Sequence, residues 1–492
     1  MKIQIIAVQL LFTVWFTDGA TFRTANYYHS HMVLQKSPAK ANIWGYGNAG
    51  ADVSVTIDGK TVSHVTIGSN TQWNVLLPPM GAGGPHVLTF TSGGVNVTLN
   101  DVMFGDVWVC SGQSNMYFQV KQLINHTDVM NRAHAYSSLR IFKLDRVQSA
   151  TPLTEPTILN QWHRPGNDAT TSSFSAVCLL YAMELIPDLG IPMGMVESSW
   201  GGTPVEAWSS PDAINVCNAH RGKRGPGTPS VLWNAMIHPI LPMTIAGAIW
   251  YQGENNAGHA AQYSCQFSSM IQDWREKFHQ QSGQQTSQLF PFGFVQLAPN
   301  ANKTIHAGFP DLRWAQTASY GYVPNPTLRN VFMAVAMDLP DFHSPYGTIH
   351  PRDKYDVAER LALAARVVAY NESNIEYQGP FPSKFTLSGH TMTIEYDQGN
   401  NPIEVRSDRG FEVCCGHSNN FTCGIYNFRP APITQHDQST VTIDTSVCHG
   451  TNHFVTGVRY AWEVSPCDVK MCAIYGEDDD LPAPAFIKHV PF

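Results

Sequence analysis

Four short segments place glycine and small polar residues directly after apolar runs. They are GQSN at 112–115 after DVWVC, WGGT at 200–203 after MVESS, QGEN at 252–255 after AIWY, and residues 338–353 after VFMAVAM. Packing alone does not require such residues at these points. If the apolar runs are parallel strands, the four segments lie at the carboxyl edge of one sheet, where ligands usually bind.

The residue types in these segments suit acyl transfer. Ser114 can act as a nucleophile if an imidazole removes its proton, and His350 is the candidate late in the chain. A tetrahedral oxyanion needs preorganised donors, which backbone N–H groups at Ser114 and the glycines and the side-chain amide of Asn255 could supply. Each residue alone is more often part of a turn or a cap, but their coincidence at four strand ends favours catalysis.

Other polar and aromatic residues of these segments could contact a sugar. Gln113 and Gln252 could hydrogen-bond to hydroxyl groups. Trp200 or Trp250 could stack on a sugar ring, although core packing is an equally good explanation for both. We therefore expect the two glutamines to bind substrate.

The elements that would hold these segments fall into three parts. Residues 38–100 alternate apolar and polar with period two, and Asp58-Gly59 predicts a hairpin, so we assign 21–100 to an N-terminal β domain. From 101 to 375, short apolar runs alternate with helical patterns such as AQYSCQFSSMIQDWREKF and RDKYDVAERLALAARVVAY. That rhythm predicts a three-layer α/β domain with a mainly parallel sheet.

The last part, 376–492, returns to strand patterns and holds six of the ten cysteines. We expect a disulfide-rich β domain, with sandwich-like modules at both ends of the chain. A zinc site is a poorer explanation of the cysteines because paired C-x-x-C units are missing. The sequence does not predict the pairing of the cysteines.

Several features of the sequence indicate the cellular compartment of the protein and the kinds of partner that it can bind. Residues 1–20 have a lysine followed by an apolar stretch and small residues, which is typical of a secretory signal peptide. N-glycosylation sequons lie at Asn96, Asn125, Asn302, Asn371 and Asn420. We expect a secreted or lysosomal glycoprotein. No later apolar run is long enough to span a membrane, and a net charge of −8 without a basic cluster argues against a nucleic-acid partner.

The blocks SGQSNM, WGGTPVEAW, WYQGENNA and IHPRDKYDVAERLALAARVVAY resemble the signature blocks of sialate O-acetylesterases, within the SGNH-hydrolase class. ANYYHSHMVLQKSPA near the start and GVRYAW and LPAPAF near the end are similar as well, so the resemblance covers nearly the whole mature chain. It implies hydrolysis of O-acetyl esters of sialic acids, such as 9-O-acetyl groups, through an acetyl-serine intermediate. It implies neither a cofactor nor a metal.

Carried over residue by residue, the resemblance implies that Ser114 is the nucleophile and His350 the general base and then the general acid. Gly202, or its neighbour Gly201, and Asn255 would be oxyanion donors beside the N–H of Ser114. We expect Gly112 to keep the approach to Ser114 free of a side chain.

One position departs from the pattern of the class. Many SGNH enzymes have an aspartate three residues before the histidine, where this chain has Gly347. Asp338 or Asp341 is our expected partner of the imidazole. Asp353 and a backbone carbonyl are alternatives, because the partner only orients the ring and stabilises its charge.

Two other functions fit the same sequence. One is an acetylesterase acting on other acetylated glycans, such as plant polysaccharides. The second is a sugar-binding glycoprotein without catalysis, in which the β modules carry the function. Oligomeric state is not predicted.

Overall fold

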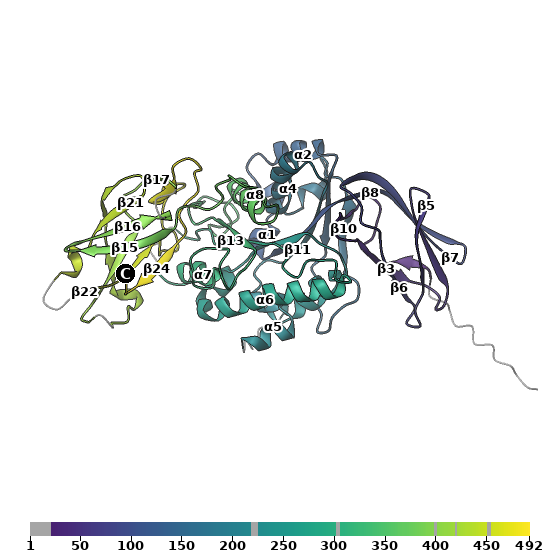
Figure 1. Ribbon diagram of the computed structural model, residues 1–492, viewed down its shortest axis with the longest axis horizontal. Helices are drawn as coiled ribbons and strands as arrows, with labels where there is room; N and C mark the ends of the chain where they lie inside the picture. The colour runs from purple at the N-terminus through teal and green to yellow at the C-terminus, as the bar shows by residue number, and fades with distance from the viewer. Residues whose placement is uncertain (1–20, 218–224, 302–305, 398–400, 419–420, 450–453) are drawn as a thin grey trace, which may run out of the picture.

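A computed structural model describes residues 21–217, 225–301, 306–397, 401–418, 421–449 and 454–492. The predicted signal peptide and the sequons at Asn302 and Asn420 lie outside these residues. The molecule is elongated, with an α/β region in the middle and an antiparallel β module at each end (Figure 1). This arrangement confirms the expected fold class.

The central sheet has the strand order β10-β9-β11-β8-β12-β13-β14, and every neighbouring pair is parallel except β10 with β9. Its strands are β8 (Val95–Gly112), β9 (Leu139–Leu144), β10 (Ile158–His163), β11 (Met193–Ser199), β12 (Gly247–Tyr251), β13 (Phe292–Gln296) and β14 (Val331–Val335). The four apolar runs DVWVC, MVESS, AIWY and VFMAVAM lie in β8, β11, β12 and β14 of this sheet. Later strands are added on both sides of β8, so its carboxyl end lies at a switch point, where such sheets bind ligands.

Helices cover both faces of the sheet (Figure 1). One face carries α2 (His126–Ala135), α4 (Ala176–Leu189) and α8 (Tyr355–Val368), and the other carries α5 (Pro211–Val216), α6 (Ala260–Gln281) and α7 (Phe309–Gln316). Both predicted helices are confirmed as α6 and α8. The N-terminus of α4 is capped by the Ser175 hydroxyl, which accepts from the Cys178 N–H, and the helix ends at Gly190 with φ of 64°.

Short helical turns complete the connections. They are α1 (Ser114–Tyr117), α3 (Ala169–Ser172), η1 (Val120–Gln122), η2 (Val205–Trp208), η3 (Gly225–Gly227), η4 (Trp233–Ile237), η5 (His238–Ile240), η6 (Glu254–His259), η8 (Ile425–Asn427) and η9 (Ser446–Cys448). Of these, α1 and η6 begin at the ends of β8 and β12, because the chain turns there from strand into helix.

The N-terminal module packs two sheets together. It contains β1 (Arg23–Thr24), β2 (Val33–Gln35), β3 (Asn42–Tyr46), β4 (Asp52–Ile57), β5 (Lys60–Thr66), β6 (Gln72–Leu76) and β7 (Gly83–Ser92). The predicted hairpin joins β4 and β5, with positive φ at Asp58 and Gly59. β8 pairs first with β7 and then with β11, so the predicted boundary at residue 100 falls within one continuous strand.

The C-terminal module is also built from antiparallel strands. They are β15 (Pro382–Ser388), β16 (Thr391–Tyr396), β17 (Ile403–Val405), β18 (Phe411–Gly416), β19 (Phe428–Pro430), β20 (Ile433–His436), β21 (Thr440–Asp444), β22 (Phe454–Tyr460), β23 (Ile474–Gly476) and β24 (Phe486–His489). Two four-stranded sheets face each other, and Phe385 of one contacts Phe486 of the other, with ring centroids 5.8 Å apart.

All ten cysteines are paired, which confirms their structural role. Cys110–Cys178 joins β8 to α4, and the other pairs are Cys217–Cys265, Cys414–Cys423, Cys415–Cys448 and Cys467–Cys472. Three of the five bridges lie within the C-terminal module. They cross-link a region of short strands that has less buried core than the α/β region.

Asn96, Asn125 and Asn371 are exposed, as glycosylation would require. Among the described residues, no helix combines the length and the apolar character needed to cross a membrane.

Candidate active site

Ser114 begins helix α1 at the point where β8 ends. Its neighbours from Val107 to Gln113 are buried, whereas Ser114 itself is partly exposed. The hydroxyl therefore reaches the surface at the carboxyl edge of the sheet, where the sequence predicts it.

Gly112 is required for a reason that differs from the expected one. Its φ is 138°, and a Cβ atom there would collide with the carbonyl oxygen of Tyr251 on β12. That carbonyl accepts a hydrogen bond from the Gln113 N–H at 2.9 Å. The expectation that Gly112 clears the approach to Ser114 is thus wrong, since the missing side chain lets two strands come together.

The loop that follows β11 packs against Ser114. The Trp200 N–H donates to the carbonyl of Gly112 at 3.0 Å, and a Cβ atom on Gly201 would lie 3.3 Å from the Ser114 Cβ. Gly202 has φ of 72°, with open space around it. A side chain at 201 would press on the nucleophile, whereas one at 202 would strain only the backbone.

Asn255 lies beside the same loop. Its side-chain Nδ2 donates to the carbonyl of Gly202 at 2.8 Å, and its backbone N–H donates to Gln113 Oε1 at 3.3 Å. The structure therefore brings the two predicted oxyanion residues into direct contact, next to the loop that carries Ser114. Their role toward an oxyanion stays a prediction.

The two glutamines do not face a substrate. Gln113 is 2% exposed, and Gln252 is fully buried. Gln252 donates to Asn256 Oδ1 at 2.7 Å and accepts from the Tyr263 hydroxyl at 3.1 Å. The expectation that these amides bind substrate directly is wrong, because both side chains are buried and form hydrogen bonds within the protein. Of the two tryptophans, Trp250 is a buried core residue and Trp200 is partly exposed.

His350 is oriented by the backbone. Its Nδ1 lies 2.7 Å from the carbonyl oxygen of Tyr346. A carbonyl can only accept, so Nδ1 carries the hydrogen and Nε2 is left as the acceptor, which is the tautomer a general base needs. Burial lowers the pKa of His350, and the nearby charge of Lys354 lowers it further, whereas the Tyr346 carbonyl partly opposes this.

The segments of Ser114 and His350 are tied together by their neighbours. The Asn115 side chain donates to the carbonyl of Ile349 at 2.9 Å, and the Phe118 and Tyr346 rings have centroids 5.4 Å apart. Among the described residues, the Ser114 hydroxyl forms no hydrogen bond with His350. Such bonds often tighten only when substrate is bound.

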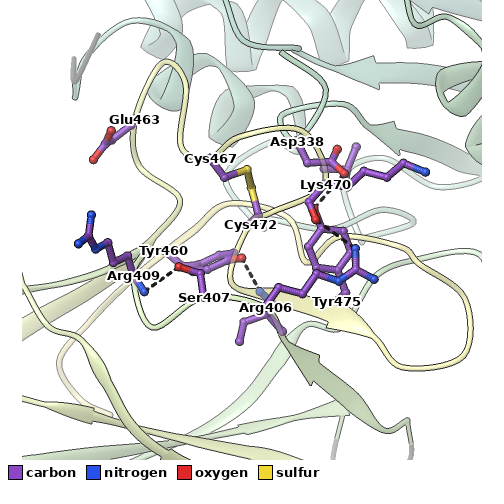
Figure 2. The surroundings of a disulfide bond; sticks show 12 residues. Asp338, Arg406, Ser407, Arg409, Tyr460, Glu463, Cys467, Lys470, Cys472 and Tyr475 are labelled. Carbon is purple, nitrogen blue, oxygen red and sulfur yellow. Dashed lines mark hydrogen bonds between the residues drawn. A yellow bond between two sulfur atoms is a disulfide. The ribbon is translucent and has the colours of Figure 1, made fainter. Parts of the chain in front are cut away.

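The expected acid partner of His350 is wrong. Asp338 is fully buried and accepts from Arg360 at 2.7 and 2.9 Å. It also accepts from the Tyr475 hydroxyl at 3.1 Å (Figure 2). Asp341 accepts from the Arg352 side chain at 2.6 and 3.0 Å. Both carboxylates are thus used in ion pairs.

The alternative carboxylate, Asp353, caps the start of α8, because its Oδ1 accepts from the N–H groups of Tyr355 and Asp356. The Tyr346 carbonyl contacts the imidazole instead. The backbone alternative is therefore the one that agrees with the geometry.

The C-terminal module supports the segment that carries His350. The Lys470 N–H donates to the carbonyl of Asp338 at 2.9 Å, and the Cys467–Cys472 bridge closes the loop around Lys470 (Figure 2). The Lys470 side chain also pairs with Asp356 of α8 at 2.9 Å.

A buried polar network below Ser114 escaped the sequence analysis. Lys354 Nζ donates to Asn115 Oδ1 at 2.7 Å, and Asn115 Nδ2 donates to Glu254 Oε1 at 2.6 Å. Lys354 is fully buried, and burial lowers its pKa to about 7. Burial also raises the pKa of Glu254. The signal was present, since each residue lies in a block that also holds Ser114, Asn255 or His350.

The sequence analysis did not identify Arg146 either. This residue follows β9, which is not among the apolar runs from which the strands were predicted. It is exposed, and its Cζ lies 4.7 Å from the Tyr117 ring centroid and 5.9 Å from that of Trp200. A cation therefore stands beside two rings that flank the nucleophile.

Known proteins resemble both the site and the whole chain. The family described as "Carbohydrate esterase, sialic acid-specific acetylesterase" matches residues 104–344, and "Sialate O-acetylesterase C-terminal domain" matches 383–490. The Sialate O-acetylesterase of Homo sapiens is 42% identical over 96% of this chain and 93% of that protein. The chain belongs to the sialate O-acetylesterase family. The Mus musculus relative of the same name is also 42% identical, over 96% and 95% of the two chains.

This membership confirms the predicted resemblance and makes the protein one of a family of carboxylic ester hydrolases. Among solved structures, a "novel carbohydrate acetylesterase from Xanthomonas citri" is similar, with a TM-score of 0.80 and 30% identity. The match covers 95% of this chain and 99% of that one. The family and the fold therefore agree from one end of the chain to the other.

Proposed function

We propose that this protein is a sialate O-acetylesterase, which hydrolyses O-acetyl esters of sialic acids such as the 9-O-acetyl group. The observation that carries the proposal is the near-full-length identity of 42% to proteins named for this activity. The partly exposed Ser114 and the backbone-oriented imidazole of His350 support it, because together they supply a nucleophile and a base.

The proposed reaction has two balanced steps. In the first, Ser114 Oγ attacks the acetyl carbonyl carbon while His350 Nε2 takes the hydroxyl proton. The tetrahedral intermediate collapses to acetyl-Ser114, and the imidazolium returns its proton to the departing sugar oxygen. In the second, a water deprotonated by His350 attacks the acetyl group, and acetate leaves as the proton returns to Ser114 Oγ.

The developing negative charge needs donors that are already in place. We assign this role to the N–H of Ser114, the N–H of Gly202 or Gly201, and the side-chain amide of Asn255. The contact of Asn255 with the glycine loop supports the assignment, since it fixes the amide beside the nucleophile. Losing one such donor typically lowers the rate about 10²- to 10³-fold. No cofactor or metal takes part in this mechanism.

The runner-up function is an acetylesterase for other acetylated glycans. The similarity to the carbohydrate acetylesterase of Xanthomonas citri favours it, because that name does not specify sialic acid. Acetate release from 9-O-acetylated sialic acid and from acetylated xylan should be compared with the same enzyme preparation. Turnover of xylan with none of the sialic acid would replace the first proposal by the second.

A third function is sugar binding without catalysis. Ser114→Ala separates it from both esterases, because a binding protein would retain its sugar affinity and never release acetate. We expect the variant to lose acetate release. An esterase activity that is equal in wild type and Ser114→Ala would contradict the assigned nucleophile.

We also propose that the protein passes through the secretory route and works outside the cell or in the lysosome. Five disulfides support this, since such bonds persist in oxidising compartments. The exposed Asn96, Asn125 and Asn371 support it too. Treatment of the secreted protein with a peptide N-glycosidase should lower its mass. An unchanged mass would contradict glycosylation at these sites.

A further inference from the structure

Sialic acids differ from neutral acetylated sugars by a carboxylate that is ionised at neutral pH. An enzyme that selects them can use a cation near the ester, and three cations near this site are buried or paired with a carboxylate. Lys143 is buried and pairs with Glu197 at 3.0 Å. Lys354 is buried in the network below Ser114, and Arg352 pairs with Asp341 at 2.6 Å.

Arg146 differs from these cations. It is exposed, and among the described residues its guanidinium forms no ion pair. Its polar contact is made by the backbone N–H, which donates to Asp145 Oδ1 at 2.8 Å. The guanidinium instead lies over the rings of Tyr117 and Trp200. A contact with ring faces leaves the N–H donors without a carboxylate partner, so they stay available for a bidentate carboxylate.

The two rings place this cation beside the nucleophile. Tyr117 follows Ser114 by three residues on α1, and residues at that spacing are neighbours on one helix face. The backbone N–H of Trp200 donates a hydrogen bond to the carbonyl of Gly112. The next residue, Gly201, packs against Ser114. Arg146 therefore contacts one ring on the helix that Ser114 begins and one ring on the neighbouring loop that packs against Ser114.

We propose that Arg146 binds the carboxylate of the sialic acid substrate and so directs its acetylated hydroxyl to Ser114. This inference rests on the proposed function. Arg146 is a specificity-determining residue, because a neutral acetylated glycan offers no charge for it to bind.

The test compares two substrates that differ at C1, where one carries an ionised carboxylate and the other its neutral methyl ester. Acetate release is measured with a 9-O-acetylated sialic acid as the free acid and as its C1 methyl ester. We expect wild type to prefer the free acid about 10- to 100-fold in kcat/KM, the usual strength of a hydrogen-bonded charge. In Arg146→Gln this ratio should fall toward 1. Arg146→Lys should keep part of the preference, because lysine retains the positive charge but lacks the paired N–H donors of the planar guanidinium.

Arg409→Gln is the matched control, because the Arg409 side chain is 92% exposed and lies on the C-terminal module. It should keep the wild-type ratio. A wild-type ratio near 1, or an unchanged ratio in Arg146→Gln, would overturn the inference. A wild-type ratio near 1 overturns the inference even if Arg146→Gln does not fold, and Arg146→Lys gives a second variant in which the ratio should fall.

The same assay distinguishes failure of the inference from failure of the proposed function. Equal cleavage of the free acid and the methyl ester removes only the role of Arg146. Cleavage of acetylated xylan with neither sialic acid substrate removes the proposed function and the inference together.

Discussion

Replacing Lys354 by methionine should change how the stability of the protein depends on pH. Lys354 is fully buried, with its ammonium 4.9 and 5.2 Å from the ring centroids of Phe118 and Tyr251. Burial lowers its pKa to about 7, from 10.5 for an ordinary lysine. Between these two values the unfolded chain holds a proton that the folded protein lacks. The folded pKa is depressed, so this group makes the free energy of unfolding rise with pH in that window.

The size of the effect follows from the linkage relation. One proton of difference corresponds to about 1.4 kcal/mol per pH unit. From pH 7.5 to 9, Lys354 should therefore add up to about 2 kcal/mol to the stability of wild type. Methionine does not titrate, so Lys354→Met loses this gain.

The assay is urea unfolding of wild type and Lys354→Met from pH 6 to 9, with the disulfides intact. The unfolding free energy of wild type minus that of Lys354→Met should be constant below pH 7 and should then increase with pH. Lys60→Met is the control, because Lys60 is exposed on β5, and its difference from wild type should change little. A Lys354→Met difference that is constant or shrinks with pH would refute the reasoning.

Three further predictions concern single residues. Because burial lowers the pKa of His350, kcat/KM should rise with pH through a midpoint below 6.5, the value of an ordinary histidine, and a pH–rate profile with a midpoint at or above 6.5 would contradict this. Asp338→Asn should cost about 3–5 kcal/mol in urea unfolding, because it breaks a buried ion pair; a loss under about 1 kcal/mol would show that the pair matters little. Gly112→Ala should abolish activity and lower Tm, since its Cβ would strike Tyr251; a wild-type Tm would disprove that clash.

Much of the fold could be predicted because a buried parallel sheet demands short apolar strands. AIWY and VFMAVAM fit that demand: the first forms most of β12, and the second contains the whole of β14. The length of β8 could not be predicted. Its sequence changes at Asp101 from alternation to a continuous apolar run, and Asp101 has φ of 54°, yet the strand continues. The hydrophobic pattern indicates which faces of a strand are buried. It does not indicate where the strand ends.

In the candidate site, too, some features could be predicted from the sequence and others could not. Ser114 and His350 carry side chains whose chemistry is readable from their types. The partner of His350 is the carbonyl of Tyr346, which any residue could provide, so no residue type marks it. Gln113 and Gln252 were misassigned because an amide that holds a loop and an amide that binds a sugar are the same in sequence. Only packing distinguishes them.

Covalent trapping tests the central claim most directly, namely that Ser114 is the nucleophile activated by His350. The protein is incubated with a fluorophosphonate, digested and mapped by mass spectrometry. We predict one modified residue, Ser114, with no modification in Ser114→Ala and much slower modification in His350→Ala. Modification of a different serine, or equal labelling of wild type and His350→Ala, would contradict the account.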